Sequence, residues 1–270
     1  MTLFFAVDAW KIFLPALILL AVAVIFAVLL VFLSKKLAVR RDPRIDEVAE
    51  HLPKANCGGC GFAGCEAFAA ALVEGKASLS ACQSTPKSER EIIVGILGGG
   101  DAEVEETVAV VRCNGGDLCK DRFSYMGYGD CQSAQLIAGG RKVCSFGCMG
   151  LGSCVKVCPK DAIKVGADGL ARVDSEKCIS CGQCISECPK SLIARIPRSA
   201  KVFVACRSDC KGKEVREMCT GGCIGCGLCM RSCPAGAIEM KDNLPVIDYR
   251  KCTGCGTCAA KCPTKCIKTR

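Results

Sequence analysis

The most strongly patterned part of the sequence is an uninterrupted apolar run near its N-terminus. Residues 12–33 carry no charged side chain and are numerous enough to cross a bilayer as a helix. Pro15 lies near the start of the run, where a helix tolerates proline. Five cations follow the run closely: Lys35, Lys36, Arg40, Arg41 and Arg44. A cleaved signal peptide is the alternative, but the run is too long for one, so the pattern predicts a single-pass anchor with the rest of the chain in the cytoplasm.

Behind this run the apolar positions form only short patterns. An alanine-rich stretch at 66–76 predicts a helix, and two β-branched runs, 107–113 and 201–206, predict strands. The segment DGLARVDSEKC at 168–178 aligns without gaps on DNLPVIDYRKC at 242–252, and each predicts a short hairpin within a repeat. Short helices and strands of this kind predict an α+β fold behind a single N-terminal transmembrane helix.

Cysteine usage changes this picture. The 270 residues include 27 cysteines but a single histidine, and only 5% are aromatic, which leaves little for large hydrophobic cores. An odd number of cysteines with repeated CxxC spacing favours metal binding over a disulfide scaffold, and a cytoplasmic location keeps thiols reduced. All-cysteine zinc sites are the alternative, because only His51 could add a histidine ligand. We therefore expect metal centres to help hold the chain together.

The segment CIGCGLCMRSCP, which begins at residue 223, is a bacterial ferredoxin run. Three cysteines of such a run bind one four-iron cluster, and the fourth, before proline, reaches the other cluster of a pair. A second run completes the pair. The predicted ligands are Cys223, Cys226, Cys229 and Cys262 for one cluster, and Cys252, Cys255, Cys258 and Cys233 for the other.

An earlier pair of runs has the same architecture, with looser spacing in its first loop. Its eight predicted ligands are Cys144, Cys148, Cys154 and Cys158, followed by Cys178, Cys181, Cys184 and Cys188. All four runs continue from the last cysteine with proline, three further residues and isoleucine. Cys266 occupies a slot that holds Ala162, Leu192 and Ala237 in the other runs, so we expect a small buried residue there rather than a ligand. Zinc ribbons, the alternative, would not produce this interlocked order.

Two further groups of cysteines lie outside these pairs. A glycine-rich loop and the alanine-rich helix carry a module that we expect to bind a fifth cluster, with zinc as the alternative: Cys57, Cys60, Cys65 and Cys82. If the two predicted strands pair, their last cysteines meet, and the following loops supply two more. The hypothesis is a sixth cluster on Cys113, Cys131, Cys206 and Cys219. Unligated thiols are the alternative, and Cys119 and Cys210 compete for the ligand positions.

Charge and motifs restrict the function. The formal net charge of +9 counts cysteines as neutral, whereas each cluster held by four thiolates adds about −2. No basic stripe with interleaved aromatic residues is present, so nucleic acid is not an expected partner. The sequence has neither a GxGxxG after a predicted strand nor a GxxxxGK[ST], so we expect no nucleotide or flavin site and no catalytic residue. Fully ligated clusters would relay single electrons.

The order of these features resembles the B subunit of the Rnf complex over nearly the whole chain. The resemblance rests on the anchor, the module at 57–82, the stretch from RCNGG to GCMGLGSCVKVCPKDAI, and the two ferredoxin-like pairs. It implies a membrane-bound ferredoxin:NAD oxidoreductase that translocates sodium ions or protons, in which this chain relays electrons. It further implies 4Fe-4S clusters as cofactors, soluble ferredoxin and the other subunits as partners, and clusters on the cytoplasmic side of the cell membrane.

The resemblance gives a domain organisation and candidate docking residues. The expected segments are an anchor at 1–40, a four-cysteine module at 41–90, a linker and middle cysteine region at 91–143, a two-cluster domain at 144–200, a connector at 201–222 and a second two-cluster domain at 223–270. Lysines near the terminal clusters could receive an acidic ferredoxin: Lys251, Lys261, Lys265 and Lys268. Alternatives are a polyferredoxin of another membrane oxidoreductase, a cluster-bearing docking or maturation protein, and a zinc-stabilised membrane scaffold.

Overall fold

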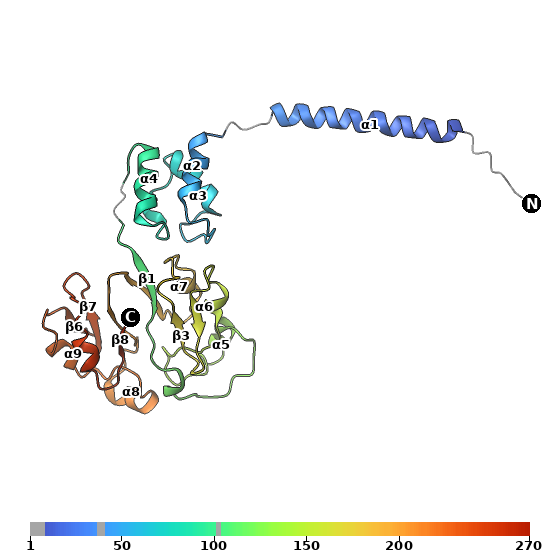
Figure 1. Ribbon diagram of the computed structural model, residues 1–270. Coiled ribbons are helices and arrows are strands. Elements are labelled where there is room, and N and C mark those ends of the chain that lie inside the picture. Colours follow the sequence, from blue (N-terminus) through green and yellow to red (C-terminus); the bar gives the residue numbers. More distant parts are fainter. Residues whose placement is uncertain (1–8, 37–40, 101–103) are drawn as a thin grey trace, which may run out of the picture. The chain divides into compact units, whose positions relative to one another are not determined.

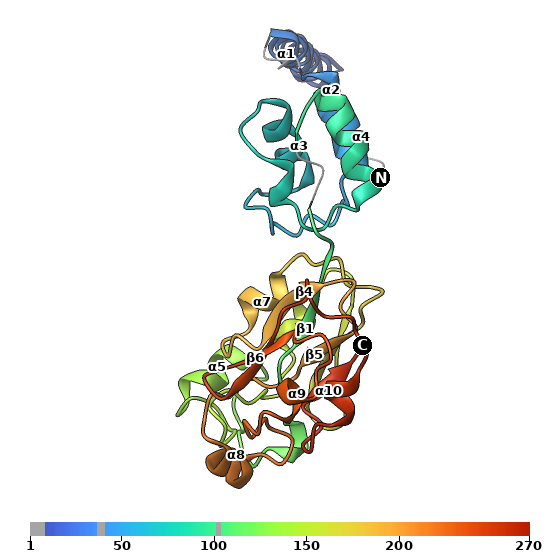
Figure 2. The same ribbon diagram turned by 90° about the vertical axis from the view of Figure 1, so that its left-hand side faces the viewer.

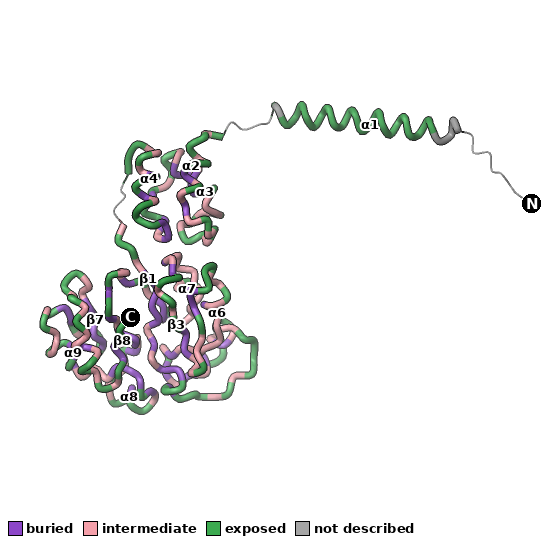
Figure 3. Tube along the Cα trace, in the orientation of Figure 1, coloured by how far each residue is buried: buried purple, intermediate pink, exposed green. Residues whose placement is uncertain are grey.

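The N-terminal helix belongs to a compact unit of its own. A computed structural model describes residues 9–36, 41–100 and 104–270 and divides the chain into two compact units, Met1–Pro43 and Arg44–Arg270 (Figure 1). Helix α1, Ala9–Lys36, is exposed along its described apolar length (Figure 3). Its segment Phe13–Ser34 is, within the described residues, the one helix long and apolar enough to cross a membrane, which fits a membrane anchor. Arg40, one of the cations predicted to set its orientation, lies outside the described residues.

The second unit begins with a small helical module. Its elements are α2 (Pro43–His51), α3 (Cys65–Val73), the 3-10 turn η1 (Leu79–Ala81) and α4 (Lys87–Leu97). Val48, Phe68 and Ile93, one from each helix, are fully buried and form the core of the module. The helix predicted at 66–76 is confirmed, although it ends earlier, because Gly75 adopts a positive φ of 71°. His51 packs between helices, with Nδ1 2.7 Å from Oε2 of Glu89.

Two ferredoxin-like domains follow, each built on two small antiparallel sheets. In the first, β1 (Thr107–Val111) pairs with β4 (Ile193–Pro197), and β2 (Ile163–Val165) pairs with β3 (Ala171–Val173). In the second, β5 (Val202–Val204) pairs with β8 (Ile267–Thr269), and β6 (Ile238–Lys241) pairs with β7 (Leu244–Ile247). The β2–β3 and β6–β7 pairs confirm the two predicted hairpins.

The pairing considered for the β-branched runs at 107–113 and 201–206 does not occur. Strand β1 pairs along its whole length with β4, and β5 pairs with β8. Each strand therefore closes its own domain, joining the segment that precedes the cluster loops to the segment that follows them. This arrangement buries β1 from Val108 to Val111 within the core of the first domain. A shared sheet is thus not what brings the cysteines of the middle region together.

The remaining helices are short and belong mostly to the cysteine loops (Figure 2). They are η2 (Gly116–Leu118), α5 (Cys131–Leu136), α6 (Ser153–Lys156), α7 (Gln183–Glu187), α8 (Gly212–Met218), α9 (Leu228–Arg231) and α10 (Thr257–Ala260). Four strands begin at the isoleucine that follows each Cys-Pro pair, and all four isoleucines are buried: Ile163, Ile193, Ile238 and Ile267. Phe203 and Tyr249 of the second domain pack against the core of the first.

Candidate metal centres

Each ferredoxin-like run presents its third cysteine from a helix of about one turn. These buried cysteines are Cys154 in α6, Cys184 in α7, Cys229 in α9 and Cys258 in α10. A glycine with a φ between 67° and 86° precedes each of these helices, a conformation that disfavours other residues. The chain can therefore reverse sharply and turn all the cysteines of a loop toward one side.

Three cavities gather the cysteines in the crossed order predicted from the sequence. One is lined by Cys158, Cys178, Cys181 and Cys184, and another by Cys233, Cys252, Cys255 and Cys258. The third is lined by Cys223, Cys226, Cys229 and Cys262, together with Cys266. In each case the fourth cysteine comes from the other run of its pair. Cys266 is only 1% exposed, as expected, but its Sγ lies 3.6 Å from that of Cys262.

The fourth cavity corrects one predicted grouping. It is lined by Cys131, Cys148, Cys154 and Cys188, so Cys131 takes the place expected for Cys144. Cys131 begins α5, whose N-cap Asp130 accepts a hydrogen bond from the backbone N–H of Ser133. The backbone N–H of Cys131 donates to Oγ of Ser153 at 2.7 Å, which fixes α5 against α6. This contact between two helices, which the spacing of cysteines does not encode, carries Cys131 to this cavity.

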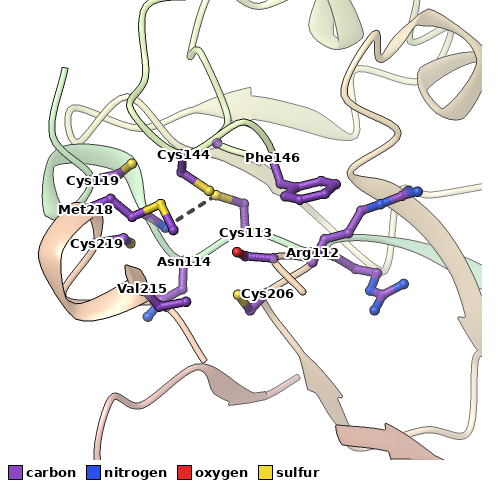
Figure 4. A pocket seen from close by; sticks show the side chains of 15 residues that line it. Arg112, Cys113, Asn114, Cys119, Cys144, Phe146, Cys206, Val215, Met218 and Cys219 are labelled. Carbon is purple, nitrogen blue, oxygen red and sulfur yellow. Dashed lines mark hydrogen bonds between the residues drawn. The ribbon is translucent and has the colours of Figure 1, made fainter. Parts of the chain in front are cut away.

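A fifth cavity, the middle cavity, lies where the two ferredoxin-like domains meet. It is lined by five cysteines: Cys113, Cys119, Cys144, Cys206 and Cys219 (Figure 4). The predicted set for a sixth cluster is therefore wrong at one position, since Cys131 lies elsewhere and Cys144 is present instead. Cys119 and Cys219 face each other across an isolated antiparallel bridge, which joins the loop after β1 to the end of α8. Cys210 lines none of these five cavities.

In the helical module, three of the four predicted ligands share one core. Cys60, Cys65 and Cys82 pack in the same cluster of side chains, and Cys57 lies on the same loop as Cys60. The buried guanidinium of Arg90 secures this site by donating to the carbonyl of Cys82 at 2.7 Å and to that of Thr85 at 2.9 Å. Nη1 of Arg90 is buried without a hydrogen-bond partner, which suits an anionic group nearby.

The backbone around these cysteines fits iron–sulfur clusters. The first or second cysteine of a loop accepts a hydrogen bond from the backbone N–H two residues ahead; the pairs are Cys148 with Gly150, Cys178 with Ser180, Cys181 with Gln183, Cys223 with Gly225, and Cys255 with Thr257. The fourth cysteine accepts from the residue four ahead, as Cys158 does from Ala162 at 3.3 Å and Cys188 from Leu192 at 3.4 Å. Such donors stabilise thiolates and adjust cluster potentials.

The geometry does not suit zinc. Across the described ranges no three His, Cys, Asp or Glu side chains lie close enough together to hold a single metal ion. Four or five cysteines nevertheless line each cavity, so their sulfurs surround a space rather than a single point. Burial raises the pKa of the Cys154 and Cys184 thiols to about 12, so coordination by a cluster must displace their protons. Cysteines that line one cavity but are too far apart to hold one ion suit a larger group, such as a four-iron cluster.

Sequence reasoning assigned Cys144 to a neighbouring cluster and left Cys119 as one of two competitors for the middle site; the structure places both in the middle cavity. For Cys144 a signal was present, because it precedes Cys148 by four positions, whereas the other runs separate their first two cysteines by three. The spacing therefore marks Cys144 as a cysteine outside its own run. Nothing comparable in the sequence marks Cys119.

Comparison with protein families agrees with these sites. A family described as "Putative Fe-S cluster" matches residues 52–84, and a "4Fe-4S dicluster domain" matches residues 144–192 and 222–266. Together with the cysteine-lined cavities, these matches define the chain as an iron–sulfur electron-transfer protein that carries several 4Fe-4S clusters and an apolar N-terminal helix.

Three relatives specify the family. The chain is 42% identical to the B subunit of the Na(+)-translocating ferredoxin:NAD(+) oxidoreductase complex of Acetobacterium woodii, over 84% of this chain and 68% of that protein. It is 45% identical to the B subunit of the proton-translocating ferredoxin:NAD(+) oxidoreductase complex of Clostridium ljungdahlii, over 84% and 81%, and 43% identical to the B subunit of the ion-translocating oxidoreductase complex of Methanosarcina acetivorans, over 83% and 85%. The chain belongs to the B-subunit family of the Rnf complex.

Proposed function

We propose that this chain takes electrons one at a time from reduced soluble ferredoxin and passes them to the other subunits of an ion-translocating ferredoxin:NAD oxidoreductase. The observation that carries the proposal is the crossed order of cysteines around the cavities of both ferredoxin-like domains. A cluster bound by four thiolates has no open coordination position, so it supplies one-electron transfer and no substrate chemistry. Reduction of NAD and translocation of the ion are then tasks of partner subunits.

We propose that the cluster in the cavity of Cys252 is the one that accepts electrons from ferredoxin. Cys255, which lines this cavity, is the exposed member of the 27 cysteines, all of which lie in the described ranges. Basic side chains surround its loop: Lys251 is exposed, the side chain of Arg250 is 93% exposed, and that of Lys201 lies against Gly254. An acidic partner would be attracted to this surface, and a short distance to the cluster favours electron transfer.

Reversing charge at this surface tests the partner. In full-length protein reconstituted with clusters, Lys251→Glu with Arg250→Glu is expected to slow reduction by reduced ferredoxin about tenfold at low ionic strength, and the difference should vanish at high salt. Stopped-flow absorbance of the clusters measures this rate. The control is Lys213→Glu with Lys164→Glu, two exposed lysines in α8 and β2. Equal rates for the two double variants at low ionic strength would exclude this docking surface.

We further propose that the clusters lie on the cytoplasmic side of the cell membrane. Lys36, Arg41 and Arg44 follow the apolar segment Phe13–Ser34 and favour a cytoplasmic position for everything behind it. A green fluorescent protein fused after Arg270 is expected to fluoresce, and alkaline phosphatase fused at the same place is expected to be inactive. The reverse pattern would contradict this orientation.

A further inference from the structure

The middle cavity is not explained by either family match. Cys113, Cys119, Cys206 and Cys219 all lie outside the matched ranges. Yet these cysteines, with Cys144, come from four separate segments of the chain and line one largely apolar space, together with Phe146 and Val215 (Figure 4). All five are buried, with 3% to 8% of their surface exposed. The family matches therefore leave the function of this group of five cysteines unassigned.

Four of these cysteines share one pattern of backbone hydrogen bonding, and the fifth has another. Four accept a hydrogen bond at Sγ from the backbone N–H two residues ahead, as the first cysteines of the cluster loops do; the pairs are Cys113 with Gly115, Cys144 with Phe146, Cys206 with Ser208, and Cys219 with Gly221. Cys119 differs, because its Sγ accepts instead from the backbone N–H of Cys144. Cys119 therefore lacks the turn that presents a ligand.

Positive charge around the middle cavity suits an anionic occupant. Arg112 and Arg207 line it, and none of the ion pairs within the described residues involves either guanidinium. Nζ of Lys142, a side chain only 3% exposed, lies 3.1 Å from the carbonyl oxygen of Cys119 and 3.1 Å from Oδ1 of Asp121, so its charge is already paired. A four-iron cluster with four thiolates carries a charge of about −2, and the two arginines are the cations that could balance it.

Two hydrogen bonds connect this cavity to the neighbouring ones. The backbone N–H of Cys148 donates to Sγ of Cys113 at 3.5 Å, and that of Cys223 donates to Sγ of Cys206 at 3.3 Å. Cys148 belongs to the cavity of Cys131 in the first domain, and Cys223 belongs to a cavity of the second domain. The first hydrogen bond thus joins the middle cavity to a cluster site of the first domain, and the second joins it to a cluster site of the second domain.

We propose that the middle cavity holds a sixth four-iron cluster on Cys113, Cys144, Cys206 and Cys219, and that this cluster carries electrons between the two ferredoxin-like domains. The inference rests on the proposed electron-relay function. In each transfer the cluster of one domain loses one electron and the middle cluster gains it, and the second domain then receives the same electron; no bond forms or breaks. Cys119 is then the one cysteine of the middle cavity that is not a ligand, and its Sγ lies within hydrogen-bonding distance of the sulfurs of Cys144 and Cys219.

Iron analysis of matched variants tests the ligand set. Full-length protein, purified and reconstituted without oxygen, is expected to hold about 24 irons, and Cys206→Ser about 20. Cys113→Ser, a ligand variant on another segment, is expected to give the same loss. Cys119→Ser is the matched control: Cys119 lines the same cavity but is not a proposed ligand, so this variant should keep every iron.

The outcomes separate this inference from the proposed function. About 20 irons in the unmodified chain, or a loss of four irons in Cys119→Ser with none in Cys206→Ser, would overturn the sixth site and leave the relay function standing. Little iron with stoichiometric zinc would overturn the relay function itself. The linking role has its own readout, which is the electron paramagnetic resonance spectrum of the fully reduced protein. Magnetic broadening of the neighbouring clusters should decrease in Cys206→Ser, and unchanged line shapes would contradict a position between the domains.

Discussion

Replacing Cys233 with serine is expected to remove the cluster in the cavity of Cys252, Cys255 and Cys258. The cluster in the cavity of Cys223, Cys226 and Cys229, which lie in the same run as Cys233, should stay intact. Cys233 lines the cavity of Cys252, Cys255 and Cys258, whereas Cys226 of its own run lines another. The variant should lose about four irons. Because this site is where we place the acceptor for ferredoxin, reduction by ferredoxin should also slow at least about a hundredfold, which corresponds to a barrier higher by about 2.7 kcal/mol.

Double variants identify which cluster is lost. Cys233→Ser combined with Cys255→Ser should lose no more iron than either change alone, because both cysteines hold one cluster. Cys233→Ser combined with Cys226→Ser should lose about eight irons, since two clusters are affected. Cys210→Ser is the control, because Cys210 lines none of the five cavities, and it should keep its full iron content. A loss of eight irons in the first double variant would contradict the crossed arrangement.

Replacing Gly150 with alanine is expected to disrupt the cavity of Cys131, Cys148, Cys154 and Cys188. Gly150 has a φ of +72°, and a Cβ there would lie 2.4 Å from the carbonyl oxygen of Gly169, in the β2–β3 turn. The added Cβ is fixed to the backbone of Gly150 and the atom it meets is a backbone oxygen, so the cluster loop or the β2–β3 hairpin must move. We expect a loss of about four irons and a destabilisation of roughly 2–4 kcal/mol from strain and displaced packing.

Gly169→Ala is a matched control for that change. Gly169 has a similar φ of +67°, but no atom lies within 4 Å of a Cβ placed on it. Only the cost of the positive φ remains, about 1 kcal/mol, and the iron content should not change. Iron content and the denaturant midpoint of cluster bleaching measure both effects. Equal behaviour of the two variants would show that the close approach to Gly169 does not shape the cluster loop.

Much of this protein could be predicted from local spacing. A cluster takes three ligands from within a few residues, so the runs that end in Cys188, Cys233 and Cys262 carry their geometry in the sequence itself. The same holds for the buried isoleucines that begin β2, β4, β6 and β8, and for the apolar run of α1, whose length alone predicts a membrane span. The two hairpins also followed from the repeat.

What the sequence left open depends on contacts between distant segments. Whether Cys131 or Cys144 joins Cys148 is decided by the packing of α5 on α6 through Ser153, and not by the number of residues between cysteines. The pairing of β1 with β4 depends on which partner buries the apolar face of β1, and two similar β-branched runs do not distinguish the partners.

The sequence by itself therefore determined the apolar helix that could cross a membrane, the crossed grouping of cysteines in the second pair and the family to which the chain belongs. Only the tertiary structure decided the composition of the middle cavity, whose cysteines lie up to 106 positions apart, from Cys113 to Cys219. The physical reason is that ligands within one loop are fixed by short-range backbone geometry. Ligands from separate domains meet only where those domains pack, and that packing follows from the burial of side chains along the whole chain.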